Sequence, residues 1–239
     1  MKQSPGRGNT EKGVNAAVLG ILRSATDLSK PLVVLDMPCG QGVFASFLQE
    51  QFPDLRVLGV DKYVEPKSSN IEFHKVGIQE FFAQQPSLRT DVITCISGIP
   101  CFDGLETLFA SFYRSLHDGG VLILTNDNVM AVRDRLTFFF FGHVRRFRLL
   151  YRQNEGNWNL VLPQALWMWL QRSGFRDIRV VYTSIHAKDY LLLPLALVMY
   201  ALFLPYLLLK KHPVTVRERL RLFPFAMFLA RHYVFVARK

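Results

Sequence analysis

Apolar and polar residues alternate in blocks along the first half of the chain, and the blocks predict a regular succession of strands and helices. Short apolar runs rich in β-branched residues are typical of buried strands. Such runs cover residues 32–35, 55–60, 71–75, 91–97 and 121–125. Buried strands separated by helices predict a parallel sheet with helices on both faces.

Between these runs the apolar residues recur at helical spacing. Helices are predicted over residues 14–28, 43–51, 79–84 and 104–116. Gly119 lies just beyond the last of them, where glycine commonly provides a left-handed cap. We therefore expect this helix to be closed by a glycine cap before the fifth strand begins.

The turn after the first predicted strand carries the first candidate chemistry. The strand ends in Asp36, and Pro38, Gly40 and Gly42 follow before a helix begins. This arrangement opens a nucleotide-sized crevice in a parallel sheet, because glycine lets the backbone approach a ligand where a Cβ would collide. Since glycine-rich turns are common, an ordinary strand–turn–helix connection is the alternative.

An acidic residue at the end of the second predicted strand strengthens the ligand interpretation. Asp61 lies 25 residues after Asp36, which is one strand–helix–strand step. At this position one carboxylate can accept both ribose hydroxyls of a nucleotide. The alternative is a solvated aspartate in a loop.

Composition is that of a folded protein from a reducing compartment. The 239 residues favour a single domain, half of them are hydrophobic and 20% are charged. Three cysteines make a sparse, odd set that does not suggest a disulfide framework, and no metal-ligand spacing is present. The polar N-terminus lacks the apolar core of a signal peptide, so we expect exposure to the cytoplasm.

The order of motifs resembles that of the class I S-adenosylmethionine-dependent methyltransferases. LDMPCGQG is similar to the family's glycine motif, and Asp61 in LGVDKY matches its ribose-binding acid. DVITCISGIPCF, LHDGGVLILTNDN and LPQALWMWLQRSGF are similar to the motifs at the fourth strand, the fifth strand and the following helix. Residues 176–182 and 232–238 would then form the sixth strand and an antiparallel seventh.

The resemblance implies an α/β fold with a doubly wound, seven-stranded, mostly parallel sheet, and S-adenosylmethionine as cofactor. It implies a cofactor site made of Asp36, Pro38, Gly40, Gly42, Asp61, Gly77, Ser97, Gly98 and Ile99. Two positions depart from the family pattern. Pro38 replaces the first glycine of the motif, and Val76, Gly77 and Ile78 stand where an acidic residue commonly follows the third strand.

Methyl transfer is a displacement in which the protein mainly positions the acceptor, and a general base is needed only for a protonated acceptor. The sequence therefore need not display a catalytic residue. His143 is a candidate base by position, against the alternative of a structural histidine. Asn126 and Asn128, at the tip of the fifth strand, are candidate acceptor-binding residues, and a polar turn is their alternative.

Two features keep nucleic-acid methylation open as a second function. Pro100-Cys101 resembles the nucleophile motif of cytosine-C5 methyltransferases, and Asp127-Asn128-Val129 resembles a second motif of that class. The surrounding glycines and glutamine and a target-recognition domain are missing, however, so we expect Cys101 to be a buried or pocket-lining thiol. A non-catalytic interaction protein on the same fold is a third possibility.

Basic charge gathers in the second half of the chain. Residues 1–130 carry 11 Lys/Arg and 14 Asp/Glu, whereas residues 131–239 carry 18 and 5. An insertion over residues 131–160 combines four consecutive phenylalanines with an arginine cluster, which suits an anionic membrane interface. A substrate lid that buries its phenylalanines on the domain is the alternative.

A second insertion, residues 186–231, separates the last two predicted strands. It contains 20 uncharged residues, 190–209, which as a helix would be about 30 Å long. Because the seventh strand must rejoin the sheet, a single membrane crossing is excluded. We expect a monotopic hairpin on the cytoplasmic side of the membrane, and a hairpin packed on a second subunit is the alternative.

These observations predict one methyltransferase domain over residues 1–239 that acts on a lipophilic or lipid-linked small molecule at a membrane surface. They do not name the acceptor or the methylated atom.

Overall fold

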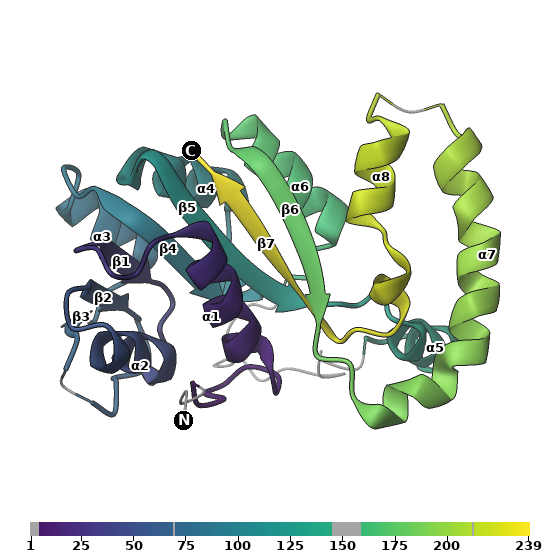
Figure 1. Ribbon diagram of the computed structural model, residues 1–239, viewed down its shortest axis with the longest axis horizontal. Coiled ribbons are helices and arrows are strands. Elements are labelled where there is room, and N and C mark those ends of the chain that lie inside the picture. Colours follow the sequence, from purple (N-terminus) through teal and green to yellow (C-terminus); the bar gives the residue numbers. More distant parts are fainter. Residues whose placement is uncertain (1–4, 69, 145–158, 212) are drawn as a thin grey trace.

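The computed structural model describes residues 5–68, 70–144, 159–211 and 213–239. One seven-stranded sheet forms its centre, in the order β3-β2-β1-β4-β5-β7-β6, and β7 runs antiparallel to its neighbours (Figure 1). The expected α/β fold is therefore confirmed. The strands are β1 (Val33–Asp36), β2 (Arg56–Val60), β3 (Glu72–His74), β4 (Thr90–Ile96), β5 (Leu116–Asp127), β6 (Arg176–Thr183) and β7 (His232–Arg238).

Two helical layers cover the sheet. On one face lie α1 (Val14–Ala25) and α2 (Val43–Gln51), and their apolar residues pack on Val34, Val92 and Ile123. On the other face lie α3 (Ile78–Gln84), α4 (Leu105–Ser115) and α6 (Pro163–Arg172). Because each central strand is buried on both sides, its sequence is a nearly continuous apolar run rather than an alternating one.

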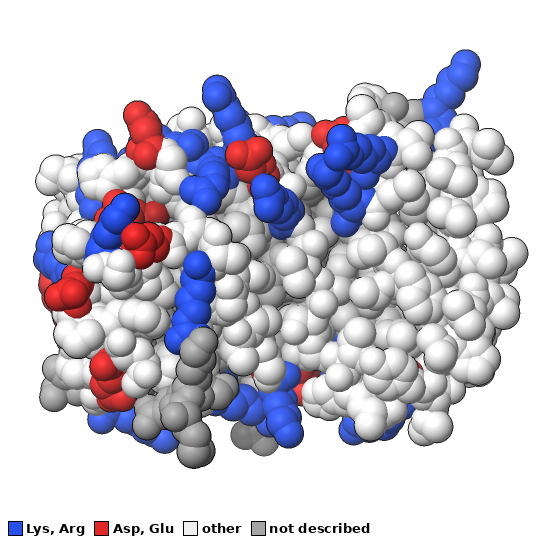
Figure 2. Space-filling view, in the orientation of Figure 1, with Lys and Arg blue, Asp and Glu red and all other residues white. Residues whose placement is uncertain are grey.

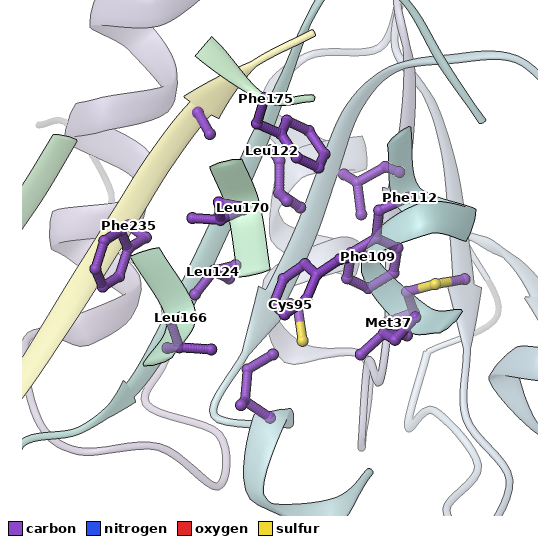
Figure 3. Packing of buried hydrophobic residues seen from close by; sticks show 14 of the residues in the cluster. Met37, Cys95, Phe109, Phe112, Leu122, Leu124, Leu166, Leu170, Phe175 and Phe235 are labelled. Carbon is purple, nitrogen blue, oxygen red and sulfur yellow. The ribbon is translucent and has the colours of Figure 1, made fainter. Parts of the chain in front are cut away.

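The second core is dense in aromatic and branched side chains. Phe109 and Phe112 from α4 and Leu166 and Leu170 from α6 are fully buried against the sheet. Figure 3 shows these side chains converging on the strands from both helices. This layer packs on β4 and β5 and so holds in place the strand ends that carry the candidate site.

The connection between α4 and β5 differs from the prediction of a glycine cap. The helix ends at Ser115, and Leu116 is already extended and paired with Thr90 of β4. Gly119, with φ of +80°, lies inside β5, where the β4–β5 register shifts. A glycine with positive φ serves a bulge as readily as a helix cap, so the sequence pattern alone did not distinguish the two.

The insertion between β6 and β7 forms a helical hairpin at one end of the molecule (Figure 1). It comprises the 3-10 helix η2 (Ala187–Leu192), α7 (Leu193–Leu209), α8 (Val216–Leu222) and the 3-10 helix η3 (Phe225–Phe228). A third apolar cluster joins Ala196 of α7 to Met227 and Phe228, and to Val132 of the neighbouring helix α5 (Val132–Phe141).

A buried ion pair fastens the base of this hairpin. Arg231 donates two hydrogen bonds, of 2.8 and 2.9 Å, to the two carboxylate oxygens of Asp189. Arg133 of α5 adds a third at 3.2 Å. The pKa of Asp189 is lowered, since these contacts outweigh the opposing effect of its burial. Breaking such a pair leaves an uncompensated charge, so the joint holds η2, α5 and β7 together.

The first insertion is described in part. Its helix α5 exposes Phe138, Phe139, Phe140 and Phe141 to solvent. The lid alternative requires these phenylalanines to be buried on the domain, whereas in the structure they are exposed. The predicted arginine cluster at 145–148 lies outside the described residues.

The apolar stretch Ala187–Leu209 is long and apolar enough to cross a bilayer, and only 11% of it is buried. The core helix of a soluble protein can have the same length and composition, but such a helix would be mostly buried. Figure 2 shows a broad surface without charged residues over α7, whereas blue and red side chains are scattered over the rest of this face.

Candidate functional site

The glycine turn after β1 holds its backbone in conformations that favour glycine. Gly40 and Gly42 have φ of +53° and +69°, in the left-handed region that L residues rarely adopt. At Gly42 a Cβ would also lie 2.8 Å from the Pro66 ring. The backbone NH of Gly42 donates to Cys39, and α2 begins immediately afterwards. The turn thus lies at the carboxyl edge of the sheet, with Gly40 partly buried and Gly42 buried beneath Pro66.

Asp61 ties the tip of β2 to this turn. Its Oδ2 accepts the Gly40 NH at 2.9 Å, and its Oδ1 accepts the NH groups of Tyr63 and Val64 at 2.8 and 2.9 Å. A carboxylate has about four acceptor positions, so Oδ2 retains capacity for a further hydrogen bond. Asp61, which the sequence places one strand–helix–strand step after Asp36, therefore contacts the glycine turn directly.

Asp36 lies at the end of β1 and is 2% exposed. Burial raises the pKa of its carboxyl to about 7, and the Asp61 charge adds to this effect, while the hydrogen bond from Thr94 opposes it. The Thr94 hydroxyl donates to Asp36 Oδ1 at 2.7 Å. A nearby cation would stabilise the ionised form of this carboxyl, because opposite charges favour ionisation.

The tip of β4 packs directly against the same turn. A Cβ at Gly98 would lie 2.2 Å from Cδ of Pro38, so only glycine fits beside that ring. Ser97 precedes it with φ of +56°, unusual for a residue with a side chain. Ile99 is fully buried in the core, whereas Gly77 has an extended φ of −66° and begins α3. Of these residues, Pro38, Ser97 and Gly98 meet at one place.

Residues 5–13 form an N-terminal strap that lies across this edge of the sheet, a feature the sequence analysis did not predict. The side chain of Asn15 donates to the carbonyls of Gly6 and Arg7 at 2.6 and 3.3 Å. Thr10 Oγ1 lies 2.7 Å from Ser97 Oγ. Further along, Lys12 O accepts a hydrogen bond from Ser184 at 2.8 Å. The strap therefore bridges β4 and the end of β6.

Asn126 and Asn128 lie on either side of Asp127 at the tip of β5, and both side-chain amides donate hydrogen bonds. Asn126 donates to Val161 O and to the Tyr233 hydroxyl, each at 3.1 Å. Asn128 donates to Met227 O and Ala230 O, each at 2.7 Å. The structure gives these side chains the role of ties to segments distant in sequence, and acceptor binding by them stays a prediction.

His143 and Cys101, the two residues with candidate reactivity, have few polar contacts among the described residues. His143 follows α5 and contacts the Val144 carbonyl at 3.2 Å and the Phe141 ring. Cys101 ends the 3-10 helix η1 (Ile99–Cys101) and is exposed, in contrast to the expectation of a buried or pocket-lining thiol. Partial desolvation and the charge of Asp61 raise the pKa of its thiol. Within the described ranges, no three His, Cys, Asp or Glu side chains are grouped to hold a metal ion.

A histidine missed by sequence reasoning lies beside Ser97. His232 is the first residue of β7 and is 1% exposed, and its Nε2 lies 3.1 Å from Ser97 Oγ. Its Nδ1 lies 3.2 Å from Oδ1 of Asp127. In the sequence it was only the start of a strand, and no local pattern connects it with residue 97.

A family model described as "Methyltransferase domain" matches residues 14–180. This match covers the glycine turn, Asp61 and the tip of β4, whereas the strap, the hairpin and His232 lie outside it. A search of curated proteins found no match.

Solved structures share the fold. A SAM dependent methyltransferase from Archaeoglobus fulgidus has a TM-score of 0.58 at 16% identity, over 95% of this chain and 96% of that chain. A mycolic acid cyclopropane synthase complexed with SAH and CTAB has 0.59 at 18% identity, over 94% and 84%. A phosphoethanolamine N-methyltransferase from Haemonchus contortus, in complex with S-adenosyl-L-methionine, has 0.52 at 17% identity, over 98% and 54%. At these identities the likeness establishes the fold.

Proposed function

The chain belongs to the methyltransferase-domain family, since the family model matches most of its length, and from this premise we propose that it transfers a methyl group from S-adenosylmethionine to a lipophilic or lipid-linked small molecule at a membrane surface. The observation that carries the acceptor class is the uncharged surface of α7 together with the exposed phenylalanines of α5.

The residues at the carboxyl edge fit this cofactor. S-adenosylmethionine has two ribose hydroxyls, a sulfonium and an ammonium group. Among the described residues, Gly40 has only the Asn9 amide within 4 Å of its Cβ position, so a ligand can approach the backbone there, and Asp61 Oδ2 retains capacity to accept a ribose hydroxyl. Asp36, whose pKa is raised to about 7, would be held in its ionised form by a cationic ligand.

The donor supplies the electrophilic methyl group and its own leaving group when bound. The chain's residues must therefore place the acceptor close to the methyl group and exclude water. Ser97 and Gly98 would border the methionine end of the donor, an assignment supported by the contact between Gly98 and Pro38 of the glycine turn. Gly77 at the start of α3 remains a candidate on the adenine side.

The membrane part of the proposal rests on the placement of exposed apolar side chains. Leu191, Leu202 and Leu209 are at least three-quarters exposed along the Ala187–Leu209 helix. A soluble monomer rarely presents a contiguous apolar surface of this kind without a partner. The basic helix α8 lies next to α7, so cations are available for anionic headgroups beside the apolar face.

A shallow, open apolar depression lies on the surface between Arg135 of α5 and α7. It has a volume of about 430 Å³ and is lined by Arg135 and by Met199, Leu202, Phe203 and Tyr206. Phe138 and Phe139 follow Arg135 on the same side of α5, because residues three and four apart share a helix face. Arg135 therefore stands between this depression and the exposed phenylalanines of α5.

Nucleic-acid methylation through a Cys101 nucleophile is disfavoured by the thiol's surroundings. A cysteine attacks as the thiolate, and the pKa of Cys101 is raised by desolvation and by Asp61. We expect Cys101→Ser to retain methyl-transfer activity within about threefold, because thiol attack is then unnecessary. Radiolabelled methyl incorporation into lipid extracts measures this. Loss of all activity, with a covalent adduct trapped on the wild-type thiol, would support the cytosine-type mechanism.

The proposed function is tested by comparing lipid extracts from cells with and without the protein by mass spectrometry. A lipid that gains the mass of one methylene only when the protein is present is the expected result. Cells that carry Asp61→Ala are the matched control and should lack the new species. Methylated RNA or DNA with unchanged lipids would favour the nucleic-acid alternative, and failure to bind S-adenosylmethionine would favour a non-catalytic protein.

A further inference from the structure

Four side chains form a connected polar chain at the carboxyl edge of the sheet. Thr10 Oγ1 lies 2.7 Å from Ser97 Oγ, and Ser97 Oγ lies 3.1 Å from His232 Nε2. His232 Nδ1 lies 3.2 Å from Asp127 Oδ1. The order is hydroxyl, hydroxyl, imidazole and carboxylate. Hydrogen bonds join the first three groups, so a proton can pass along them, whereas the carboxylate lies in electrostatic contact with the imidazole without hydrogen-bond geometry.

The sheet topology brings these residues together. β5 lies between β4 and β7, and Asp127 and His232 are register partners where β5 ends and antiparallel β7 begins. Ser97 is the residue after β4, and its backbone NH donates to Thr125 Oγ1 of β5 at 2.9 Å. Three adjacent strand ends thus supply the three groups, beside the turn assigned to the methyl donor.

The local backbone and burial indicate more than an ordinary surface contact. Ser97 keeps a left-handed φ of +56°, which costs free energy and persists only where surrounding contacts hold it. His232 is 1% exposed, and Thr10, on the strap, is 7% exposed. Ser97 between them is partly buried, so the strap and β7 shield much of the Ser97–His232 contact from water.

Charged groups around the chain favour one protonation pattern. Asp127 faces Nδ1 of His232, whereas the neighbouring Arg231 is committed to Asp189. On the strap, Glu11 lies 3.6 Å from His186, and the Arg7 side chain donates to Thr10 O. With Nδ1 protonated towards Asp127, Nε2 is free to accept the Ser97 proton.

We propose that Ser97, His232 and Asp127 form a proton relay that serves methyl transfer to a hydroxyl oxygen, and that the Thr10 hydroxyl occupies the position of the acceptor hydroxyl in this structure. This inference rests on the proposed function and deepens it, because it assigns the acceptor to the class of alcohols or phenols. Ser97 is the group that meets the acceptor, and His232 and Asp127 are positioning residues that act through it.

Ser97 and His232 account for every proton transferred in this step. The acceptor oxygen forms a bond to the methyl carbon as the carbon–sulfur bond breaks, and the sulfur takes that electron pair. The acceptor's proton passes to Ser97 Oγ while the Ser97 proton passes to Nε2 of His232. The resulting imidazolium lies beside the Asp127 carboxylate, which stabilises it, and the proton later leaves to solvent.

The first test needs no substrate. Nitrogen-15 NMR of histidine-labelled protein, with the His232 signals assigned by their absence in His232→Gln, reports which ring nitrogen carries the proton. We expect a protonated Nδ1 and an unprotonated Nε2 near neutral pH. A protonated Nε2 in the neutral ring would overturn the relay, because His232 would then donate to Ser97 and could not accept its proton.

The second test measures transfer of labelled methyl groups to a membrane lipid extract. General-base assistance contributes roughly 10²–10⁴-fold, so Ser97→Ala and His232→Gln should each lower the rate at pH 7 by at least about 100-fold. The deficit should shrink as pH rises, since hydroxide replaces the missing base. Donor affinity measured by calorimetry should change less than about threefold in His232→Gln, which lies outside the cofactor contacts.

Ser184→Ala is the matched control, because it removes another hydrogen bond of the strap without touching the relay. It should retain wild-type activity. An equal loss in Ser184→Ala and Ser97→Ala, or a pH-independent loss in His232→Gln, would assign the cluster to anchoring the strap and overturn the proposal. No transfer by the wild type to any lipid, with the expected tautomer present, would instead contradict the proposed function.

Discussion

Asp61→Ala is expected to weaken S-adenosylmethionine binding by about 100-fold or more. The variant would lose a charge-assisted hydrogen bond from the ribose to the carboxylate, worth about 1.5–3 kcal/mol. It would also lose its contacts with the Gly40 NH and the NH groups of Tyr63 and Val64, which order the turn and the β2 tip. Titration calorimetry with the purified protein measures the change.

Asp61→Asn separates the contacts of the two carboxylate oxygens. The amide keeps one oxygen that can accept the NH groups of Tyr63 and Val64, but its nitrogen cannot accept from Gly40 or from the ribose. We therefore expect an affinity close to that of Asp61→Ala, with a thermal stability between those of Asp61→Ala and the wild type. If Asp61→Ala binds the donor as tightly as the wild type while remaining folded, Asp61 does not contact the ribose.

A triple variant of the hairpin, with Leu191, Leu202 and Leu209 changed to serine, is expected to release the protein from membranes. These side chains are 82%, 75% and 80% exposed, so their removal should leave the fold intact. If each contributes about 1 kcal/mol of partial burial in lipid, the partition coefficient falls by about 100-fold. Flotation with vesicles that contain anionic lipid measures this partition.

Tyr63→Ser serves as the control, because Tyr63 is 79% exposed but follows β2 at the opposite end of the sheet. It should float like the wild type. A wild-type protein that stays at the bottom of the gradient would contradict the membrane proposal. In that case a shift from dimer to monomer in the triple variant would identify a second subunit as the partner of this face.

Local sequence patterns were sufficient for the strands, most helices and the glycine turn. The positions of Asp36, Gly40 and Asp61 at neighbouring strand ends were predictable because these residues follow at fixed spacing along one strand–helix–strand unit, and their role in cofactor binding stays a prediction. The length of β5 was not, since a positive-φ glycine at Gly119 fits both a cap and a bulge.

Contacts between distant segments account for the remaining differences. The amides of Asn126 and Asn128 bond to carbonyls 35 to 102 residues away, contacts that the sequence did not predict, and acceptor binding by these residues stays a prediction. His232 and Ser97 are separated by 135 residues, and Thr10 lies in a polar segment without periodicity. No pattern within one element reports that the fold will bring these three together.

The hairpin leaves the sheet after Thr183 and returns at His232, and these two residues are register partners on neighbouring strands. An insertion whose ends already meet adds little entropic cost to closing the sheet, so it behaves as an exchangeable module. Under the proposed function, the hairpin makes the membrane contact and the sheet edge carries the methyl-transfer site. A hairpin of different surface composition, grafted between the same two residues, would redirect the same methyl-transfer machinery to another compartment or partner.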